Sequence, residues 1–228
     1  MCIRDRKYPE DWVDKLFVYC IVSTVIGARL GHCLFYEWDY YSVHPAEILK
    51  IWKGGLASHG GVFAIILALV WYSKKVTKKS VWWLFDRMIP AVAVVCFCIR
   101  FGNLMNSEIY GYPTTLPWGF EFVRSREWHQ LYEGLPCHPT QIYEMLYCLV
   151  AGVTAWVMYH KYHLQNRVGL ITGVSLLIFF GSRFVLEFMK NPQVVEETNM
   201  TLNIGQWLSV PLILLGGYLI YKSKTAKV

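Results

Sequence analysis

A polar stretch, residues 99–111, follows a long apolar run of this sequence. On a helix, Arg100, Asn103 and Ser107 fall on one face, and Asn106 continues the row from Asn103. A charge at the centre of a bilayer costs about 2.5–3.5 kcal/mol on insertion scales, so an arginine in this setting is a candidate functional residue. A polar row of this length among apolar residues favours an anionic or hydrogen-bonding ligand, or a partner helix.

Other polar side chains stand at the ends of further apolar runs. His59 lies in the glycine-rich stretch 54–61, and an imidazole can accept a proton near neutral pH, so His59 is a candidate base. Arg29 and Arg183 are two more arginines within apolar runs. Backbone carbonyls or a structural carboxylate are the alternative partners for Arg29. Glu187 follows Arg183 by four residues and could pair with it on a helix.

A third polar group begins an apolar run near the middle of the chain. Pro139 suits the first turn of a helix, and His138, Gln141 and Glu144 follow one another at three-residue spacing on nearly one side. A metal site formed by His138 and Glu144 is the alternative. Their spacing is poor for chelation compared with histidines at i and i+4, so we expect no metal and no other cofactor.

The elements that carry these side chains are predicted by clustered hydrophobicity. The 228 residues are 55% hydrophobic, with mean hydropathy +0.32, and a membrane-spanning helix needs about 20 mostly apolar residues. We expect an all-α polytopic integral membrane protein, with residues 1–228 as a single membrane domain. A large soluble helical protein is disfavoured, because runs such as 146–159 have no polar face. The predicted spans are approximately 16–36, 56–73, 85–105, 140–160, 168–188 and 204–221.

The distribution of positive charge orients these spans. The net charge is +6, and clusters of Lys, Arg and His precede the first span and follow the second, fourth and sixth. The positive-inside rule places these clusters in the cytoplasm, so the loops 37–55, 107–139 and 189–203 face outward. We expect 107–139 to form a small periplasmic cap between the third and fourth spans. Four cations in the outer loops, at 50, 53, 124 and 126, depart from the rule.

This topology brings the polar groups to the outer ends of four spans. Such convergence predicts one polar cavity that opens toward the outer leaflet. Two arginines suit a phosphate, which guanidinium binds through two parallel hydrogen bonds, and a phospholipid is the natural phosphate carrier in a membrane. We expect membrane lipids as partners and no nucleic acid.

Smaller features complete the organisation of the chain. Gly27 and Gly31 form a small-xxx-small pair that allows close helix approach. Residues 45–52 form an amphipathic piece that we expect on the membrane surface, and the alternation in 118–122 predicts a short strand or hairpin. The seven cysteines show no CxxC metal pattern, and we expect no structural disulfide.

Several motifs occur here in one order along the chain. They are Gly27–Gly31, Gly54–Gly61, Arg100–Gly111, His138–Glu144, Arg183–Phe188 and Gly205–Gln206. On these motifs the sequence resembles the bacterial prolipoprotein diacylglyceryl transferase family. The resemblance implies transfer of the diacylglyceryl group of phosphatidylglycerol to the lipobox cysteine thiol in the signal peptide of a preprolipoprotein. It also implies a multi-pass enzyme of the bacterial inner (cytoplasmic) membrane, with glycerol phosphate as the second product.

The resemblance, joined to the chemistry of the side chains, predicts residue roles. Three residues are predicted to be catalytic: His59 as the base for the thiol, and Arg100 and Arg183 as stabilisers of the phosphate. Which residue is the base stays open. The predicted substrate-binding residues are Asn103, Asn106, Glu108, Gly111, His138, Gln141, Glu144, Glu187 and Arg29.

Two further expectations concern the start of the chain and a rival function. The family has seven spans, so six spans and a polar start predict a chain that begins in the cytoplasmic loop after a first span. The rival function is a transporter or channel for an anionic solute. That function predicts polar residues along whole helices, whereas inner halves such as 64–70 and 150–158 are apolar.

Overall fold

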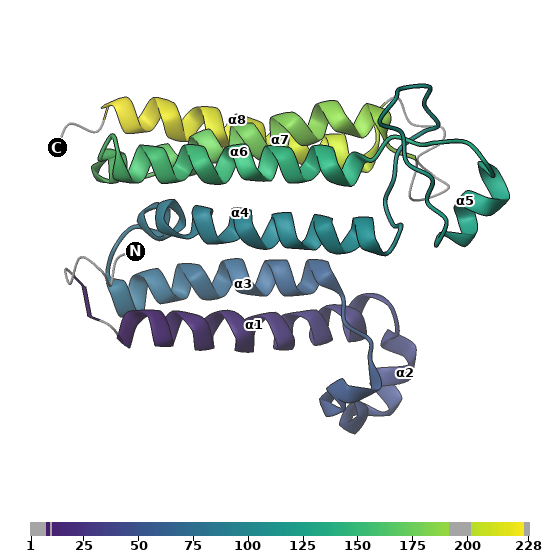
Figure 1. Ribbon diagram of the computed structural model, residues 1–228. Helices are drawn as coiled ribbons and strands as arrows, with labels where there is room; N and C mark the ends of the chain where they lie inside the picture. The colour runs from purple at the N-terminus through teal and green to yellow at the C-terminus, as the bar shows by residue number, and fades with distance from the viewer. Residues whose placement is uncertain (1–7, 10, 192–201, 226–228) are drawn as a thin grey trace. The chain divides into compact units, whose positions relative to one another are not determined.

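The computed structural model describes residues 8–9, 11–191 and 202–225 (Figure 1). Within these residues the chain is all-α, and six of its helices are long and apolar enough to cross a membrane. The predicted polytopic helical fold is therefore confirmed. The six helices are α1 (Asp11–Phe35), α3 (Ser58–Tyr72), α4 (Val81–Met105), α6 (Thr140–His160), α7 (Leu170–Leu186) and α8 (Ile204–Thr225).

The outer surfaces of these helices are apolar. Only 11 to 33% of the most apolar window of each helix is buried within the protein. Large side chains such as Phe17, Val94 and Leu214 are each more than 60% exposed. Apolar surface on this scale is unfavourable in water and is expected against lipid. The chain is therefore a multi-pass membrane protein.

The chain divides into two compact units, residues 1–84 and 85–228. In the first unit α1 packs against α3, and Gly27 and Gly31 face α3 as predicted. A Cβ atom at Gly31 would lie 2.8 Å from the Cα of Gly60. Without side chains at these positions the two backbones approach closely, which increases van der Waals contact in a setting where lipid removes the hydrophobic drive for association.

The loop between α1 and α3 contains three short helices. They are α2 (Trp38–Val43) and two 3₁₀ helices, η1 (Pro45–Leu49) and η2 (Ile51–Lys53). The predicted amphipathic piece forms the two 3₁₀ helices, and Leu49 and Trp52 are 77% and 76% exposed. Its position on the membrane surface stays a prediction. After α3 the chain makes one π-helical stretch, η3 (Ser73–Thr77), before α4 begins.

The second unit contains α6, α7, α8 and most of α4, and residues 106–139 form a cap next to the end of α4 (Figure 1). The cap includes the short helix α5 (Arg126–Leu131) and has its own core of buried side chains: Tyr110, Phe122, Trp128 and Cys137. The strand predicted at residues 118–122 does not form. Turns at Leu116–Gly119 and Phe122–Ser125 interrupt the extended backbone, and within 118–122 a single β-bridge remains, between Phe120 and Cys137.

A buried carboxylate on α4 holds the start of α7. Asp86 is 1% exposed and accepts hydrogen bonds from the N–H groups of Gly169 and Thr172, at 2.7 and 2.8 Å. It also accepts the Thr172 hydroxyl at 2.6 Å. The first N–H groups of a helix have no partner within the helix, so Asp86 satisfies two of the donors near the start of α7. Asp86 was not among the residues predicted from the sequence.

We predict that Asp86→Asn lowers the free energy of unfolding by about 1–3 kcal/mol, because the amide loses the charge and turns an N–H group toward hydrogen-bond donors. The measurement is equilibrium unfolding in mixed detergent micelles. Asp39→Asn is the matched control, since Asp39 is exposed on α2. Equal stability of the two variants would refute the assigned role of Asp86.

Candidate active site

Arg100 joins α4 to α6 through an ion pair. Its Nε lies 2.8 Å from Oε2 of Glu144, and its Nη1 donates to Oδ1 of Asn103 at 3.2 Å. The Arg100 side chain is 19% exposed and that of Glu144 is completely buried. The pair therefore lies at the outer edge of the packed helices, where one partner remains open to a ligand.

Glu144 bridges two cations. Its Oε1 accepts a hydrogen bond from Nζ of Lys190 at 2.8 Å and one from the Tyr147 hydroxyl at 3.4 Å, while its Oε2 faces Arg100. The Lys190 side chain is only 3% exposed. Buried charges are costly unless they are paired and hydrogen-bonded. Here each carboxylate oxygen has its own cation.

The second carboxylate of the site is Glu187, in the 3₁₀ turn η5 (Glu187–Met189) that follows α7. Its Oε2 lies 3.6 Å from Nζ of Lys190 and 3.9 Å from Nε of Arg183, so the predicted Arg183–Glu187 pair is confirmed. A Cβ atom at Gly205 would lie 2.5 Å from Oε1 of Glu187. The glycine therefore lets the positive end of α8 approach the carboxylate.

The start of α8 is built by a reciprocal cap. The Asn203 side chain accepts the N–H of Gln206 at 2.9 Å, and the Gln206 side chain accepts the N–H of Asn203 at 3.1 Å. The same two side chains donate to the carbonyls of Glu187 and Phe184, at 3.4 and 3.3 Å. The cap therefore fixes the end of α7, and with it the position of Glu187.

These contacts form one charge network, in which cations and carboxylates alternate from Arg100 through Glu144, Lys190 and Glu187 to Arg183. Three cations face two carboxylates, which leaves one positive charge for an anionic ligand. Lys190 was not among the site residues predicted from the sequence. Its signal was a lysine that follows Glu187 by three residues, close to the apolar span.

A pocket of about 280 Å³ lies beside the two arginines, between α4, α6 and α7. Arg100, Arg183 and Tyr147 form its polar part, and the remainder is apolar or holds thiols. Among the described residues, Nη2 of Arg100 and both terminal nitrogens of Arg183 have no hydrogen-bond acceptor, so their N–H groups can donate to a ligand. The pocket thus fits an amphiphile with an anionic head and an apolar body. The other lining residues are Ile89, Val92, Cys96, Ile99, Cys148, Leu176, Phe179 and Phe180.

The polar row predicted along α4 is shorter than expected. Because α4 ends at Met105, Ser107 leaves the helical face; its φ is +57°, and that of Ile109 is +60°. A positive φ is strained for a β-branched residue. Hydrogen bonds from α6 hold this turn: Gln141 donates to the carbonyl of Glu108 at 2.6 Å, and Thr140 donates to that of Ile109 at 2.8 Å.

The other predicted residues around Arg100 separate into two groups. Asn103 joins the site, since its amide also donates to Oε2 of Glu108 at 3.1 Å. Asn106 is exposed, and its side chain has no partner in the part of the chain that the structure describes. The Nδ1 of His138 lies 3.2 Å from the hydroxyl of Tyr143 on α6, so His138 contacts Tyr143 and not a member of the charge network.

Gly111 connects the cap to the end of η5. Its N–H donates to the carbonyl of His138 at 2.9 Å, and its carbonyl accepts from the Asn191 amide at 3.2 Å. The next N–H, that of Tyr112, donates to the Met189 carbonyl at 3.0 Å. A Cβ atom at Gly111 would clash with that carbonyl oxygen. The glycine therefore permits the contact that holds Lys190 in place.

In the first unit, Arg29 is buried and organises the loop before α3. Its guanidinium donates to the backbone carbonyls of Glu47, Ile48, Gly54 and Gly55, at 2.6 to 3.1 Å. The alternative of an arginine satisfied by backbone carbonyls is therefore confirmed. On the surface of this loop, hydrogen bonds from Lys50 and Lys53 lower the pKa of Glu47 to about 2. The predicted contact of Arg29 with substrate stays untested.

His59 lies in the first turn of α3 and is exposed. The ring centroids of Phe35 and Tyr36 lie 6.0 and 5.6 Å from that of its imidazole. His59 belongs to the first unit and Arg100 to the second, so their predicted convergence stays a prediction. Among the described residues, no three His, Cys, Asp or Glu side chains come together as a metal site requires.

The sequence of this chain is similar to those of known proteins over most of its length. Residues 2–222 match the family described as prolipoprotein diacylglyceryl transferase. A protein of Porphyromonas gingivalis named phosphatidylglycerol–prolipoprotein diacylglyceryl transferase is 46% identical over 96% of this chain and 80% of its own length. Proteins of the same name from Chloroherpeton thalassium and Tolumonas auensis are 45% and 40% identical, over 96% and 98% of this chain and 79% and 84% of their own lengths.

Proposed function

Since the chain belongs to the prolipoprotein diacylglyceryl transferase family, we propose that its charge network and the pocket beside it bind phosphatidylglycerol for transfer of the diacylglyceryl group to a prolipoprotein. The protein is a transferase of lipoprotein biosynthesis, which sets aside the alternative of an anion transporter. One observation supports the assignment of the site: Arg100 and Arg183 stand at the polar part of an otherwise apolar pocket. A phospholipid has this distribution of charge and apolar surface.

The reaction is a displacement at carbon. The thiol sulfur of the lipobox cysteine attacks the glycerol carbon that carries the phosphate in phosphatidylglycerol. A carbon–sulfur bond forms, the carbon–oxygen bond to phosphate breaks, and glycerol phosphate leaves. The phosphate gains a negative charge as it leaves, so cations aimed at its oxygens stabilise the transition state more than the ground state. Arg100 and Arg183 supply these cations.

The remaining residues of the site hold the two arginines. Glu144 fixes the Nε edge of Arg100, and Asn103 holds its Nη1, which orients the guanidinium. Lys190 pairs with both Glu144 and Glu187, so that the two carboxylates do not cancel the charge of the two arginines completely and one net positive charge remains for the ligand. Asn103 and Glu108 lie at the open side, where they can orient the glycerol head group.

The thiol must lose its proton, and we assign this step to His59. Cysteine attacks as a thiolate, and an exposed imidazole accepts a proton near neutral pH. The exposure of His59 supports this role. We also place the enzyme in the bacterial inner membrane with its site toward the outer leaflet, because the basic clusters of the sequence lie at the opposite helix ends.

The test is incubation of the protein with phosphatidylglycerol vesicles and a lipobox peptide. The expected result is a mass gain of one diacylglyceryl group on the peptide cysteine, absent with a Cys→Ser peptide or with phosphatidylcholine vesicles. His59→Ala should slow transfer most at low pH, where thiolate is scarce, whereas exposed His44 gives a matched control variant, His44→Ala. No mass gain with any vesicle would overturn the proposed function.

We predict that Gly111→Ala slows transfer by about 100-fold, because a shift of about 1 Å in the positioning elements has an effect of this size. The added methyl group collides with the Met189 carbonyl and displaces Lys190. The initial rate of peptide modification measures the effect. Gly102→Ala is the control, since a Cβ atom there meets no atom within 4 Å. Equal rates for the two variants would contradict the prediction.

A further inference from the structure

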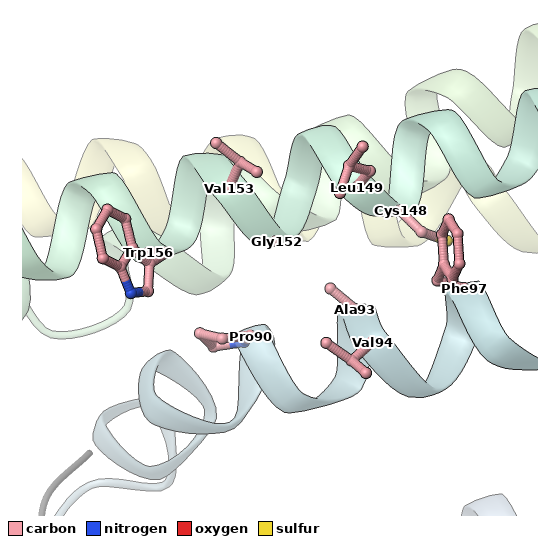
Figure 2. Close-up of a pocket in the computed structure, with 9 residues that line it drawn as sticks. All are labelled: Pro90, Ala93, Val94, Phe97, Cys148, Leu149, Gly152, Val153 and Trp156. Carbon is pink, nitrogen blue, oxygen red and sulfur yellow. The ribbon is translucent and has the colours of Figure 1, made fainter.

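An apolar groove of about 330 Å³ lies between α4 and α6 of the second unit. None of the nine residues that line it carries a charge. Figure 2 shows Phe97 and Cys148 at one end of this groove, and Pro90 and Trp156 at the other. A hydrocarbon is therefore the ligand whose chemistry matches the lining.

The groove has a buried floor and exposed walls. Ala93 and Cys148 are each 2% exposed and lie at the floor, whereas Val94 and Val153 stand on the two walls and are 63% and 53% exposed. A Cβ atom at Gly152 would lie 3.0 Å from the Cβ of Ala93. The absence of a side chain at residue 152 therefore keeps the groove deep, and a larger residue there would fill it.

The dimensions of the groove suit one hydrocarbon chain. Cys148 and Trp156 are eight residues apart, which is about 12 Å along a helix. Spread over this length, the volume of the groove gives a mean cross-section of about 30 Å². An α-helix with its side chains is about 10–12 Å across, a cross-section of about 80 Å² or more. A helix of a partner protein is therefore too wide, whereas a single acyl chain fits.

The groove is continuous with the pocket that contains the two arginines. Cys148 lines both of them. Phe97 precedes Arg100 by three residues, so the groove begins about one helical turn from the Arg100–Glu144 ion pair. Its other end, at Trp156, is twelve residues from Glu144, or about 18 Å along α6. A lipid whose phosphate contacts Arg100 is therefore placed with its tail at the open end of the groove.

We propose that this groove binds one acyl chain of the phosphatidylglycerol substrate, and that Trp156 marks the end of the space for that chain. The inference rests on the proposed function and adds an acyl-chain site to it. Bilayer lipid is as apolar as the groove, so burial alone does not favour binding. A chain whose head group is held by two arginines is tethered beside the groove, which raises its effective concentration above that of other lipids. Once bound, the chain restrains the glycerol carbon that the thiol attacks.

The first experiment uses two photoreactive lipids in phosphatidylcholine vesicles. One is phosphatidylglycerol with a diazirine in the middle of one acyl chain, and the other is phosphatidylcholine with the same chain. After irradiation, mass spectrometry should find adducts at Val94 and Val153 more often with the phosphatidylglycerol probe. Adducts at Leu214, an exposed residue of α8, should be equally frequent with both probes and serve as the internal control.

The second experiment fills the groove and varies the chain length. Gly152→Leu should lower kcat/KM for dipalmitoyl phosphatidylglycerol by about tenfold, the effect of overfilling a packed site. Dihexanoyl phosphatidylglycerol should be transferred at a nearly unchanged rate, because its chains end before residue 152. Gly217→Leu is the matched control, since Gly217 is exposed on α8 and a Cβ atom there meets no atom within 4 Å. Val153→Trp fills the groove from an exposed wall and should reproduce the effect without disturbing the buried floor.

The outcomes separate the acyl-chain site from the proposed function. Adducts no more frequent at Val94 and Val153 than at Leu214 would overturn the acyl-chain site. Equal labelling of the groove by both probes would make it a site for any bilayer lipid and would overturn its assignment to the substrate. An equal loss of rate with both chain lengths in Gly152→Leu and Val153→Trp would contradict it as well. Wild-type protein that is labelled in the groove but modifies no lipobox peptide would instead overturn the proposed function.

Discussion

Arg100→Lys is expected to lower kcat/KM for diacylglyceryl transfer by about 10²–10³-fold, the range seen when one preorganised donor to a developing negative charge is removed. Lysine keeps the charge but not the planar fork of donors. It cannot contact Glu144 and Asn103 together while also presenting N–H groups to a phosphate. The effect should fall on kcat rather than on KM alone, because the phosphate gains charge only as it leaves.

Initial rates over a range of phosphatidylglycerol concentrations measure this prediction. Arg126→Lys is the matched control, because Arg126 is an exposed arginine in the first turn of α5. Thermal unfolding of both variants separates loss of catalysis from loss of fold. If Arg100→Lys kept the wild-type kcat/KM, Arg100 would not be the residue that stabilises the departing phosphate.

Glu144→Gln is expected to have the largest effect on stability. Removal of one partner from a buried ion pair costs about 3–5 kcal/mol, because it leaves an uncompensated charge. Here two cations, Arg100 and Lys190, would lose their shared carboxylate, and Lys190 is almost fully buried. Transfer should fall as well, since Arg100 loses the contact at its Nε.

Equilibrium unfolding in mixed micelles measures the stability of Glu144→Gln, with Glu121→Gln, an exposed glutamate of the cap, as the control. The double variant Glu144→Gln/Lys190→Met removes the buried cation that lost its partner. It should regain part of the stability without regaining activity. A single variant as stable as Glu121→Gln would contradict the assigned bridging role of Glu144.

The sequence by itself determined the helices, because membrane spans depend on local hydrophobicity. Six spans were predicted, and the described residues contain six helices that are long and apolar enough to cross a membrane; α6 has the predicted limits, residues 140–160. Short motifs also predicted local contacts correctly. Gly27 and Gly31 mark a close helix contact, and Arg183 and Glu187 pair at i and i+4. Each of these features depends on residues within one or two turns, or on the size of one side chain.

Only the tertiary structure decided which partners the charged residues have. A sequence gives no distance between Arg100 and Glu144, nor between Glu144 and Lys190, which is 46 residues further along the chain. Helical periodicity also predicted that Ser107 continues the polar row of α4. In the structure α4 ends at Met105, and a hydrogen bond from α6 stabilises the strained turn that follows. Long-range packing and buried charge pairing depend on the folded chain, so they were visible only once the helices had been brought together.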